Sequence, residues 1–109
     1  INGVGFIYKE LEDNTESGVM RNAIDQYKNK LKSGVIVLSS ISKKGKLTAA
    51  VGVTDNLVSK ISAKSLAELI ADELGGNGGG RENFAQAGGS DPSKMPLAID
   101  SLKEFLSKI

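Results

Sequence analysis

The sequence predicts an α/β (α+β) fold in which helices pack on a compact mixed sheet. Two observations carry this prediction. Apolar side chains alternate with a period of two in some segments and recur every three or four residues in others. Glycines and charged turn residues separate these segments, which gives the order β-α-β-β-α-β(β)-α. We expect residues 1–109 to form a single globular domain, because 109 residues suffice for one core.

The first elements are a half-buried strand and an amphipathic helix. Residues 3–11 show the alternation of a strand. Ser17 is the expected cap of a helix that extends to about Lys32. This helix places four large side chains on one face: Met20, Ile24, Tyr27 and Leu31. Gly34 follows a lysine-rich last turn and is expected to end the helix.

A hairpin follows, with arms at residues 35–42 and 46–54 and a turn of Lys43, Lys44 and Gly45. The first arm begins with four consecutive apolar residues. We therefore expect it to be a central strand that is covered on both faces.

The remaining elements are a second helix, a short strand and a last helix. Ser65 is the expected cap of the second helix, which extends to Leu74 and is stopped by two glycines. A short strand is expected around residues 85–87, and Asp91 leads into the last helix. The apolar stripe of that helix is expected to comprise Met95, Ala98, Leu102, Phe105, Leu106 and Ile109.

Composition excludes most kinds of active site. The chain has no cysteine and no histidine, so thiolate nucleophiles, histidine triads and zinc sites built on either residue are excluded. A hydrolase would have to use acids such as Asp55, Asp72 and Glu73, and the last two are adjacent and point about 100° apart on a helix. We expect no catalytic residue and no metal site. No leader and no membrane-spanning run is visible, so a cytoplasmic location without membrane contact is expected.

Charge is unevenly distributed along the chain. Residues 21–64 carry nine basic and two acidic side chains, a net +7, and the rest sums to −6. Such asymmetry is compatible with a basic face that meets phosphates. Taken alone, it favours the alternative, an ordinary solvated surface on which the charges mix after folding.

Five of the six residues at 75–80 are glycine, but neither nucleotide-binding motif is present. The P-loop requires lysine and then serine or threonine after its last glycine, whereas Arg81 and Glu82 stand there. The dinucleotide fingerprint follows a strand and opens a helix, whereas this segment follows a helix.

A specific resemblance rests on Gly-Gly-Asn-Gly-Gly-Gly-Arg at 75–81 and Phe-Ala-Gln-Ala-Gly-Gly at 84–89. These residues resemble the signature near the end of alanine–tRNA ligases, which continues into a last amphipathic helix. The preceding elements are also similar to that family's C-terminal globular domain, of the DHH-associated superfamily. The departures are Asn77, where lysine or glycine is expected, and residues 82–84 in place of a Pro-Asp-Met-like spacer.

The resemblance implies a non-catalytic domain of a larger enzyme. The parent would join alanine to its tRNA with ATP and hydrolyse mischarged seryl- and glycyl-tRNA. Upstream domains would hold both active sites together with ATP, Mg and Zn, and this domain would hold no cofactor. The domain would bind the outer corner of the tRNA and so link aminoacylation with editing. The implied partners are tRNA and the upstream domains, and a homodimer is a further candidate.

We expect the RNA-binding surface to comprise Gly78, Gly79, Gly80 and Arg81, with Lys43, Lys44 and Lys46 flanking them. Glycines expose backbone N–H groups, and arginine can fork onto a phosphate. The alternative for the hairpin lysines is solubility at an exposed tip. For Gln86 a buried amide that fixes the last strand is favoured. The four aromatic residues Tyr8, Tyr27, Phe84 and Phe105 are expected in the core rather than as stacking platforms, and among them Phe84 is the best candidate for an exception.

Two other classes of function stay open. The domain that follows DHH-type phosphoesterases shares the fold and binds nucleic acid, but it typically has histidine after the glycine run, where Arg81 stands. The other class is an interaction module that holds two synthetase chains together.

Overall fold

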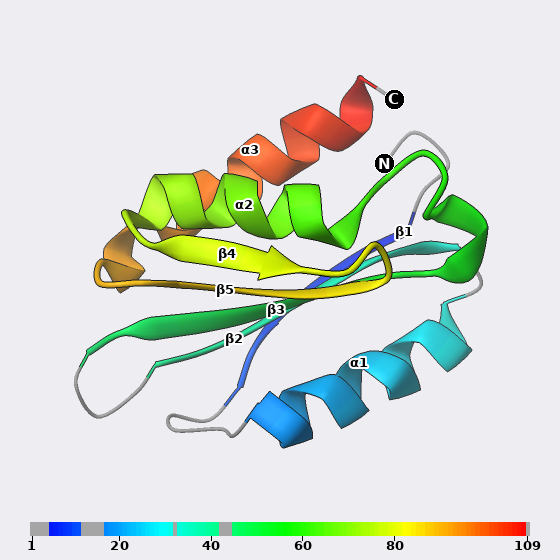
Figure 1. Cartoon of the computed structure of the whole chain (residues 1–109), viewed down its shortest axis with the longest axis horizontal. Coiled ribbons are helices and arrows are strands. Elements are labelled where there is room, and N and C mark those ends of the chain that lie inside the picture. The colour runs from blue at the N-terminus through cyan, green and yellow to red at the C-terminus, as the bar shows by residue number, and fades with distance from the viewer. Residues whose placement is uncertain (1–4, 12–16, 32, 42–44, 109) are drawn as a thin grey trace.

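The structure, a computed structural model, describes residues 5–11, 17–31, 33–41 and 45–108. Within these residues a mixed sheet of five strands has the order β1-β2-β3-β5-β4 (Figure 1). The strands are β1 (Gly5–Glu10), β2 (Gly34–Ile41), β3 (Leu47–Val53), β4 (Asn77–Gly80) and β5 (Phe84–Gly89). The β1–β2 pair is parallel and the other pairs are antiparallel. The predicted fold class and hairpin are confirmed.

Helices cover both faces of the sheet. The α-helices of the described residues are α1 (Ser17–Lys30), α2 (Ala63–Leu74) and α3 (Met95–Ser107), and the 3-10 helices are η1 (Asp55–Leu57) and η2 (Pro92–Lys94). Figure 1 shows α1 on one face of the sheet and α2 and α3 on the other. Because β1 and β2 are parallel neighbours, the chain must cross from one end of the sheet to the other between them, and α1 lies in that connection.

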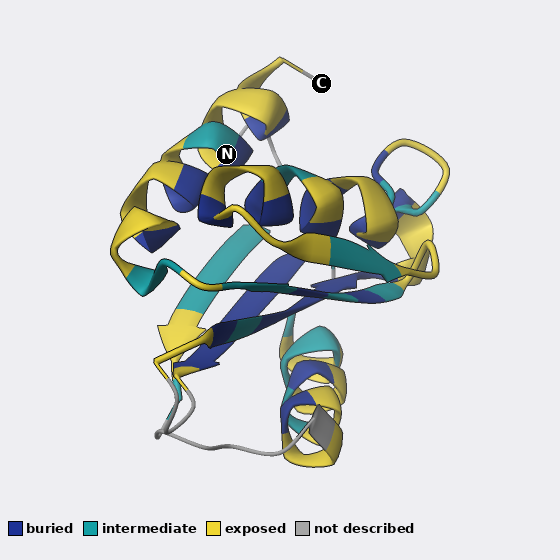
Figure 2. Cartoon of the chain, turned by 60° about the vertical axis from the view of Figure 1, so that its left-hand side comes forward, coloured by how far each residue is buried: buried dark blue, intermediate teal, exposed yellow. Residues whose placement is uncertain are grey.

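Strand β2 is central and covered on both faces, as its apolar run predicts (Figure 2). Val35 and Val37 belong to the core beneath α2 and α3, whereas Ile36 and Leu38 belong to the core beneath α1. None of the four has exposed surface. Successive side chains of a strand point to opposite faces, so this one strand contributes to both cores.

Gly34 does not end the first helix, contrary to the sequence-based expectation. Helix α1 ends at Lys30, Lys32 lies outside the described residues, and Gly34 is the first residue of β2. A Cβ at Gly34 would lie 2.3 Å from Leu31 Cδ2 and 2.6 Å from Gly5 O. Glycine is therefore required here by the close approach of β1 to β2, and not by the end of a helix.

Ser65 does not cap the second helix, and this prediction is also wrong. Helix α2 begins at Ala63, and Ser62 at the cap position makes no capping bond with its side chain. The Ala63 N–H instead donates to Glu82 O at 2.8 Å, so the turn between β4 and β5 satisfies the first turn of α2. The predicted glycine stop is confirmed, because Gly75 has the left-handed φ of 71° that favours glycine.

The last helix buries most of its expected stripe but not Phe105. The predicted residues with buried side chains are Met95, Ala98, Leu102 and Leu106. Phe105 is 38% exposed, because Leu102 and Leu106 occupy the side of α3 that faces the core. Ile109 lies outside the described residues. Among those residues, no helix combines the length and apolar character needed to cross a bilayer.

The glycine segment forms β4, an edge strand held in close contact with its neighbours. A Cβ at Gly78 would lie 2.6 Å from Ala67 O on α2, and one at Gly76 would lie 1.8 Å from Gly88 O. A Cβ at Gly79 would meet nothing within 4 Å. Backbone contact thus requires glycine at Gly78 and Gly76, whereas Gly79 faces open space.

We predict that Gly78→Ala lowers the free energy of unfolding by about 1–3 kcal/mol, because the added methyl group overpacks the contact with α2. Gly79→Ala adds the same group one residue along the same strand and should change stability by less than about 0.5 kcal/mol. Urea denaturation of both variants measures the difference. Equal destabilisation by the two substitutions would contradict this account of the strand.

Candidate functional site

Backbone hydrogen bonds fix the turn between β4 and β5. The Arg81 N–H donates to Phe84 O at 2.7 Å and closes the turn. The Val53 N–H donates to Asn83 O at 3.1 Å, and the first turn of α2 donates to Glu82 O. The backbone of the turn that carries the Arg81 side chain is therefore hydrogen-bonded to both β3 and α2.

Lys28 anchors the same turn from the opposite face of the sheet. Its ammonium Nζ on α1 donates to Asn83 O at 2.8 Å. Because α1 and α2 lie on different faces of the sheet, the turn is held from both sides (Figure 1). A lysine that is distant in the sequence thus helps to determine where Arg81 lies.

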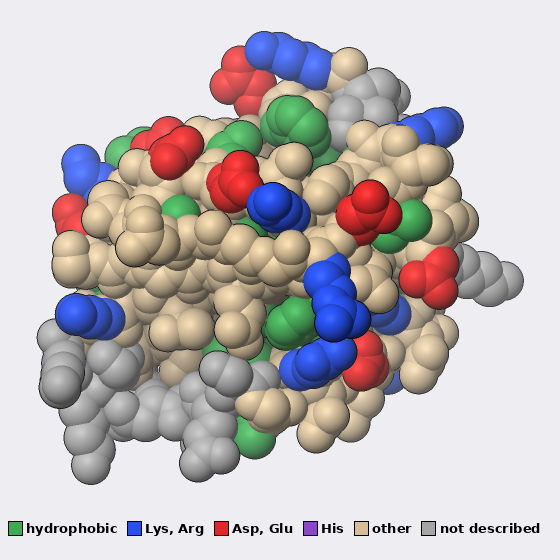
Figure 3. Space-filling view, in the orientation of Figure 1, with side chains coloured by type: hydrophobic (Ala, Val, Ile, Leu, Met, Phe, Trp, Pro, Cys, Tyr) green, Lys and Arg blue, Asp and Glu red, His purple; other side chains and the backbone are tan. Residues whose placement is uncertain are grey.

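Arg21 and Arg81 line a common hollow beside the C-terminal end of β4. The hollow has a volume of about 230 Å³, and its other lining residues are Gly79, Gly80, Phe84, Ala85 and Gln86. Arg21 comes from α1 and Arg81 from the turn, so the fold joins two segments that lie 60 residues apart in the chain. Figure 3 shows Lys and Arg side chains gathered on this part of the surface.

Both guanidinium groups of the hollow are available to an anion. Within the described residues the observed ion pair joins Lys108 and Glu104 at 3.3 Å on α3, and neither arginine takes part in one. Arg21 Cζ lies 5.2 Å from the centroid of the Phe84 ring, a distance suitable for a cation–π contact. An unpaired guanidinium can make two parallel hydrogen bonds to a phosphate.

Gly79 and Gln86 shape the open side of this hollow. They are partners in the β4–β5 ladder. The fold imposes no glycine at position 79, since a side chain there would extend into open space. The Gln86 side chain is half-buried, and in the described part of the chain it has no hydrogen-bond partner. The expectation of a buried amide that fixes the last strand is therefore wrong.

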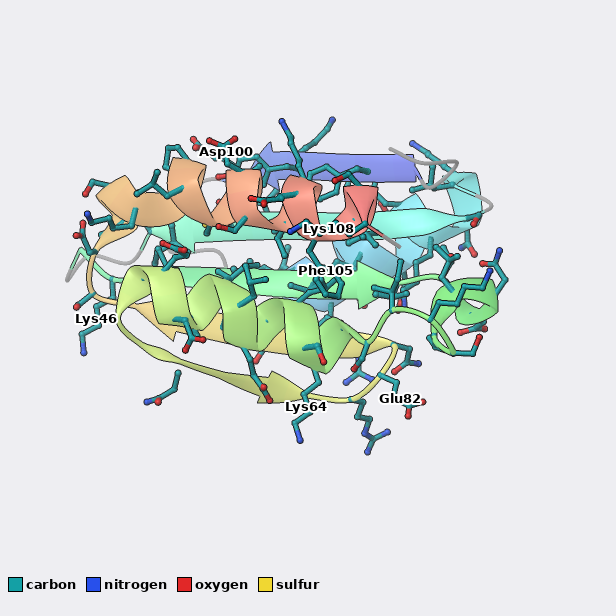
Figure 4. The ribbon with its side chains drawn as sticks, turned by 90° about the horizontal axis from the view of Figure 1, so that it is seen from above. Lys46, Lys64, Glu82, Asp100, Phe105 and Lys108 are labelled. Carbon is teal, nitrogen blue, oxygen red and sulfur yellow. The ribbon has the colours of Figure 1, made fainter. Side chains whose placement is uncertain are left out.

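The structure does not bring Lys46 next to Arg81. Lys46 precedes β3 and lines a different hollow together with Gly75, Gly76 and Asn77. The pairing of β3 with β5 separates it from the turn by six residues of strand, or about 20 Å. Figure 4 shows Lys46 and Glu82 at opposite ends of this edge of the sheet. Lys43 and Lys44 lie outside the described residues.

Sequence reasoning missed Arg21 as a member of this site. Arg21 belongs to the basic stretch of the chain, but no spacing rule links it to the glycine segment. Only the packing of α1 against the sheet places it over Phe84. The half-buried ring of Phe84 packs against the core beneath α1, and the guanidinium group covers it.

The candidate acids of a hydrolase do not form one site. Asp55 lines a hollow with Arg81 and Glu82, and neither Asp72 nor Glu73 lines that hollow. Glu73 instead accepts a hydrogen bond from Ser101 Oγ at 3.3 Å on the outer surface of α2 and α3. In the described ranges of the chain, no three His, Cys, Asp or Glu side chains are grouped so as to hold a metal ion.

Tyr8 is a structural residue, as expected. Burial raises the pKa of its phenol, the hydrogen bond with Ser39 opposes this shift, and the Glu10 carboxylate adds to it. The phenol oxygen lies 3.2 Å from Ser39 Oγ and donates to Glu10 Oε1 at 3.3 Å. The ring packs against the core beneath α2 and α3. These contacts hold the neutral phenol at the sheet and give it no role in the hollow.

The chain belongs to the DHHA1 domain family, which matches residues 3–108. Within that family it is similar to alanine–tRNA ligases. It is 43% identical over 108 residues to the enzyme of Shewanella amazonensis and 44% identical over 108 residues to that of Haemophilus influenzae. Each match covers 99% of this chain and 12% of the relative, so the chain spans about an eighth of the relatives' length.

A solved structure supports the same relationship. The C-Ala domain of alanyl-tRNA synthetase from Aquifex aeolicus is 32% identical to this chain and superposes with a TM-score of 0.89. The match covers 98% of this chain and 95% of the other. The resemblance to the C-terminal domain of alanine–tRNA ligases, carried by the glycine run and Ala-Gln-Ala-Gly-Gly, is thereby confirmed.

We predict that Lys28→Met loosens the turn that carries Arg81. The substitution keeps most of the alkyl chain and removes the donor to Asn83 O. The global free energy of unfolding should fall by about 1 kcal/mol or less, because the bond is partly exposed to solvent. Amide exchange of residues 81–83 should become faster, while exchange in β2 stays unchanged. Unchanged exchange in the turn would show that the backbone bonds suffice to fix it.

Proposed function

We propose that this chain is a non-catalytic tRNA-binding domain of an alanine–tRNA ligase. The observation that carries the proposal is that the guanidinium groups of Arg21 and Arg81 line one hollow at the edge of the sheet and have no ion pair within the described residues. Gly79 leaves the backbone of that edge open to close approach. Structured RNA is recognised mainly through its shape, its sugar–phosphate backbone and its exposed bases, and these groups suit such contacts.

The parent enzyme would attach alanine to its tRNA with ATP and edit mischarged seryl- and glycyl-tRNA in the cytoplasm. Because this chain spans about an eighth of its relatives, both reactions, and the ATP, Mg and Zn that they use, belong to other domains in this proposal. The domain described by this structure would hold the outer corner of the tRNA. One bound tRNA could then serve the aminoacylation and editing sites in turn.

A second candidate function is an interaction surface between two synthetase chains. Helix α3 exposes Leu97 by 50% and Phe105 by 38%, and their spacing of eight residues places them on one side of the helix. Exposed large apolar side chains are typical of interaction surfaces only when they form a wide patch. Sedimentation of the chain at two concentrations separates this candidate from a monomeric tRNA-binding domain.

We predict that the isolated chain retards tRNA in a gel and that an unstructured RNA of equal length competes poorly. The two positive charges that Arg21 and Arg81 bring to the RNA predict an affinity that falls about tenfold between 50 and 200 mM salt. The measurement is a binding titration at both salt concentrations. An affinity that does not depend on salt would be inconsistent with recognition through phosphates.

We predict that Arg81→Ala weakens tRNA binding by about 1–3 kcal/mol, because a charge-assisted contact is lost. The melting temperature should stay unchanged, since the exposed Arg81 side chain has no ion pair in the described structure. Gly79→Val should weaken binding as well, because it adds a branched side chain at the hollow, and its Cβ would have no other atom of the fold within 4 Å.

Lys103→Ala is the matched control, because it removes an exposed positive charge from α3 on the far side of α2. It should leave tRNA affinity nearly unchanged. If Lys103→Ala and Arg81→Ala weaken binding equally, the effect comes from net charge and not from the hollow. If the melting temperature of Arg81→Ala falls together with affinity, Arg81 is a structural residue.

A further inference from the structure

We infer that the hollow seats an unpaired nucleobase, with the Arg21 guanidinium as its stacking surface and the Gln86 amide at its edge. This inference rests on the proposed RNA-binding function and adds to it the chemical group that is recognised. Arg81 then contacts the phosphate that follows the base. In this proposal Arg21 and Gln86 contact the base and Arg81 contacts the phosphate. Only the contacts of Arg21 and Gln86 depend on the presence of a base.

The contact of Arg21 with Phe84 is the first argument. Its Cζ lies 5.2 Å from the centroid of the Phe84 ring, so the protein holds the guanidinium group beside an aromatic ring at the hollow. The side chain is exposed and has no ion-pair or hydrogen-bond partner among the described residues. A planar guanidinium group positioned in this way is a surface on which a base can stack. A lysine ammonium would provide charge at this position but no plane.

The Gln86 side chain is the second argument, and it is independent of charge. The Gln86 amide lines the hollow without a partner in the described residues. Its polar atoms are open to solvent at the hollow, since no buried side-chain nitrogen or oxygen in the described part of the chain lacks a partner. The amide offers both a carbonyl acceptor and N–H donors, which match the mixed donors and acceptors on the edge of a base. A phosphate offers only acceptors and can pair with the N–H donors alone.

The size and lining of the hollow agree with a ligand of several atoms. Its volume of about 230 Å³ is many times the roughly 10–15 Å³ that one water molecule requires on the same measure. Gly79 and Gly80 bound one side of it without side chains, so a flat ring can approach the strand backbone closely. Gly80 also has a φ of 149°, which only glycine adopts readily, and this conformation starts the turn that carries Arg81.

Two RNAs with the same number of phosphates test the inference. One is a stem-loop with unpaired loop bases, and the other is the same stem-loop with abasic loop nucleotides. Arg21→Lys, which keeps the charge and removes the plane, should weaken binding of the first RNA by roughly 5- to 100-fold and leave the second unchanged. Gln86→Met, which keeps the side-chain length and removes the amide, should act in the same direction. Thermal melting of each variant verifies that it is folded.

Arg81→Lys is the matched control, because it is the same substitution at the other guanidinium of the hollow. It should weaken binding of both RNAs by similar factors, since a fork onto phosphate is lost in each. If Arg21→Lys leaves the base-bearing RNA unchanged, or weakens both RNAs equally, the base seat is refuted while RNA binding stands. If the unaltered chain binds neither stem-loop nor tRNA, the base seat and the proposed function are both refuted.

Discussion

The arrangement of this domain depends on close backbone contacts at positions where no side chain fits. Gly78 lies directly against the carbonyl of Ala67 on α2, and Gly76 lies against the carbonyl of Gly88 on β5. These contacts place the edge strand close to both α2 and β5, and a Cβ at Gly76 or Gly78 would push these elements apart. The position of the β4–β5 turn, and with it the position of Arg81, follows from this approach. The glycine run is therefore structural in most of its length, and Gly79 is the residue to which the packing assigns no role.

Basic residues that are neighbours in the sequence do not lie together on the surface of the folded domain. The basic stretch at residues 21–64 suggests one basic face, but the fold distributes its members. Lys46 lies about 20 Å from the turn, and Lys28 donates to a backbone carbonyl. The two arginines that share the hollow come from the start of this stretch and from outside it. The number of basic residues in the sequence therefore indicates that a positively charged surface exists, but not which residues form it.

The elements that could be predicted from the sequence are those specified by local physics. The hairpin, the buried strand β2 and the left-handed stop at Gly75 follow from alternation, apolar runs and glycine conformation. The failures occur where a distant segment replaces a local signal. Glu82 O satisfies the start of α2, so no serine cap is needed at Ser65. Of the two arginines that line the hollow, Arg81 could be selected from the sequence because it follows the glycine run, whereas no motif indicates Arg21.

The placement of Arg21 on α1 couples the hollow to the less strongly held layer of the domain. In the described residues the core beneath α1 contains five buried side chains, against twenty-one in the core beneath α2 and α3. Detachment of α1 therefore exposes far less apolar surface than global unfolding, and it can occur as a separate local opening event. Such an opening removes Arg21 and the Lys28 bond together while the sheet and its other two helices persist. A ligand bound between Arg21 and Arg81 would stabilise the state in which α1 is packed on the sheet. Ligand binding and the packing of α1 are therefore thermodynamically linked.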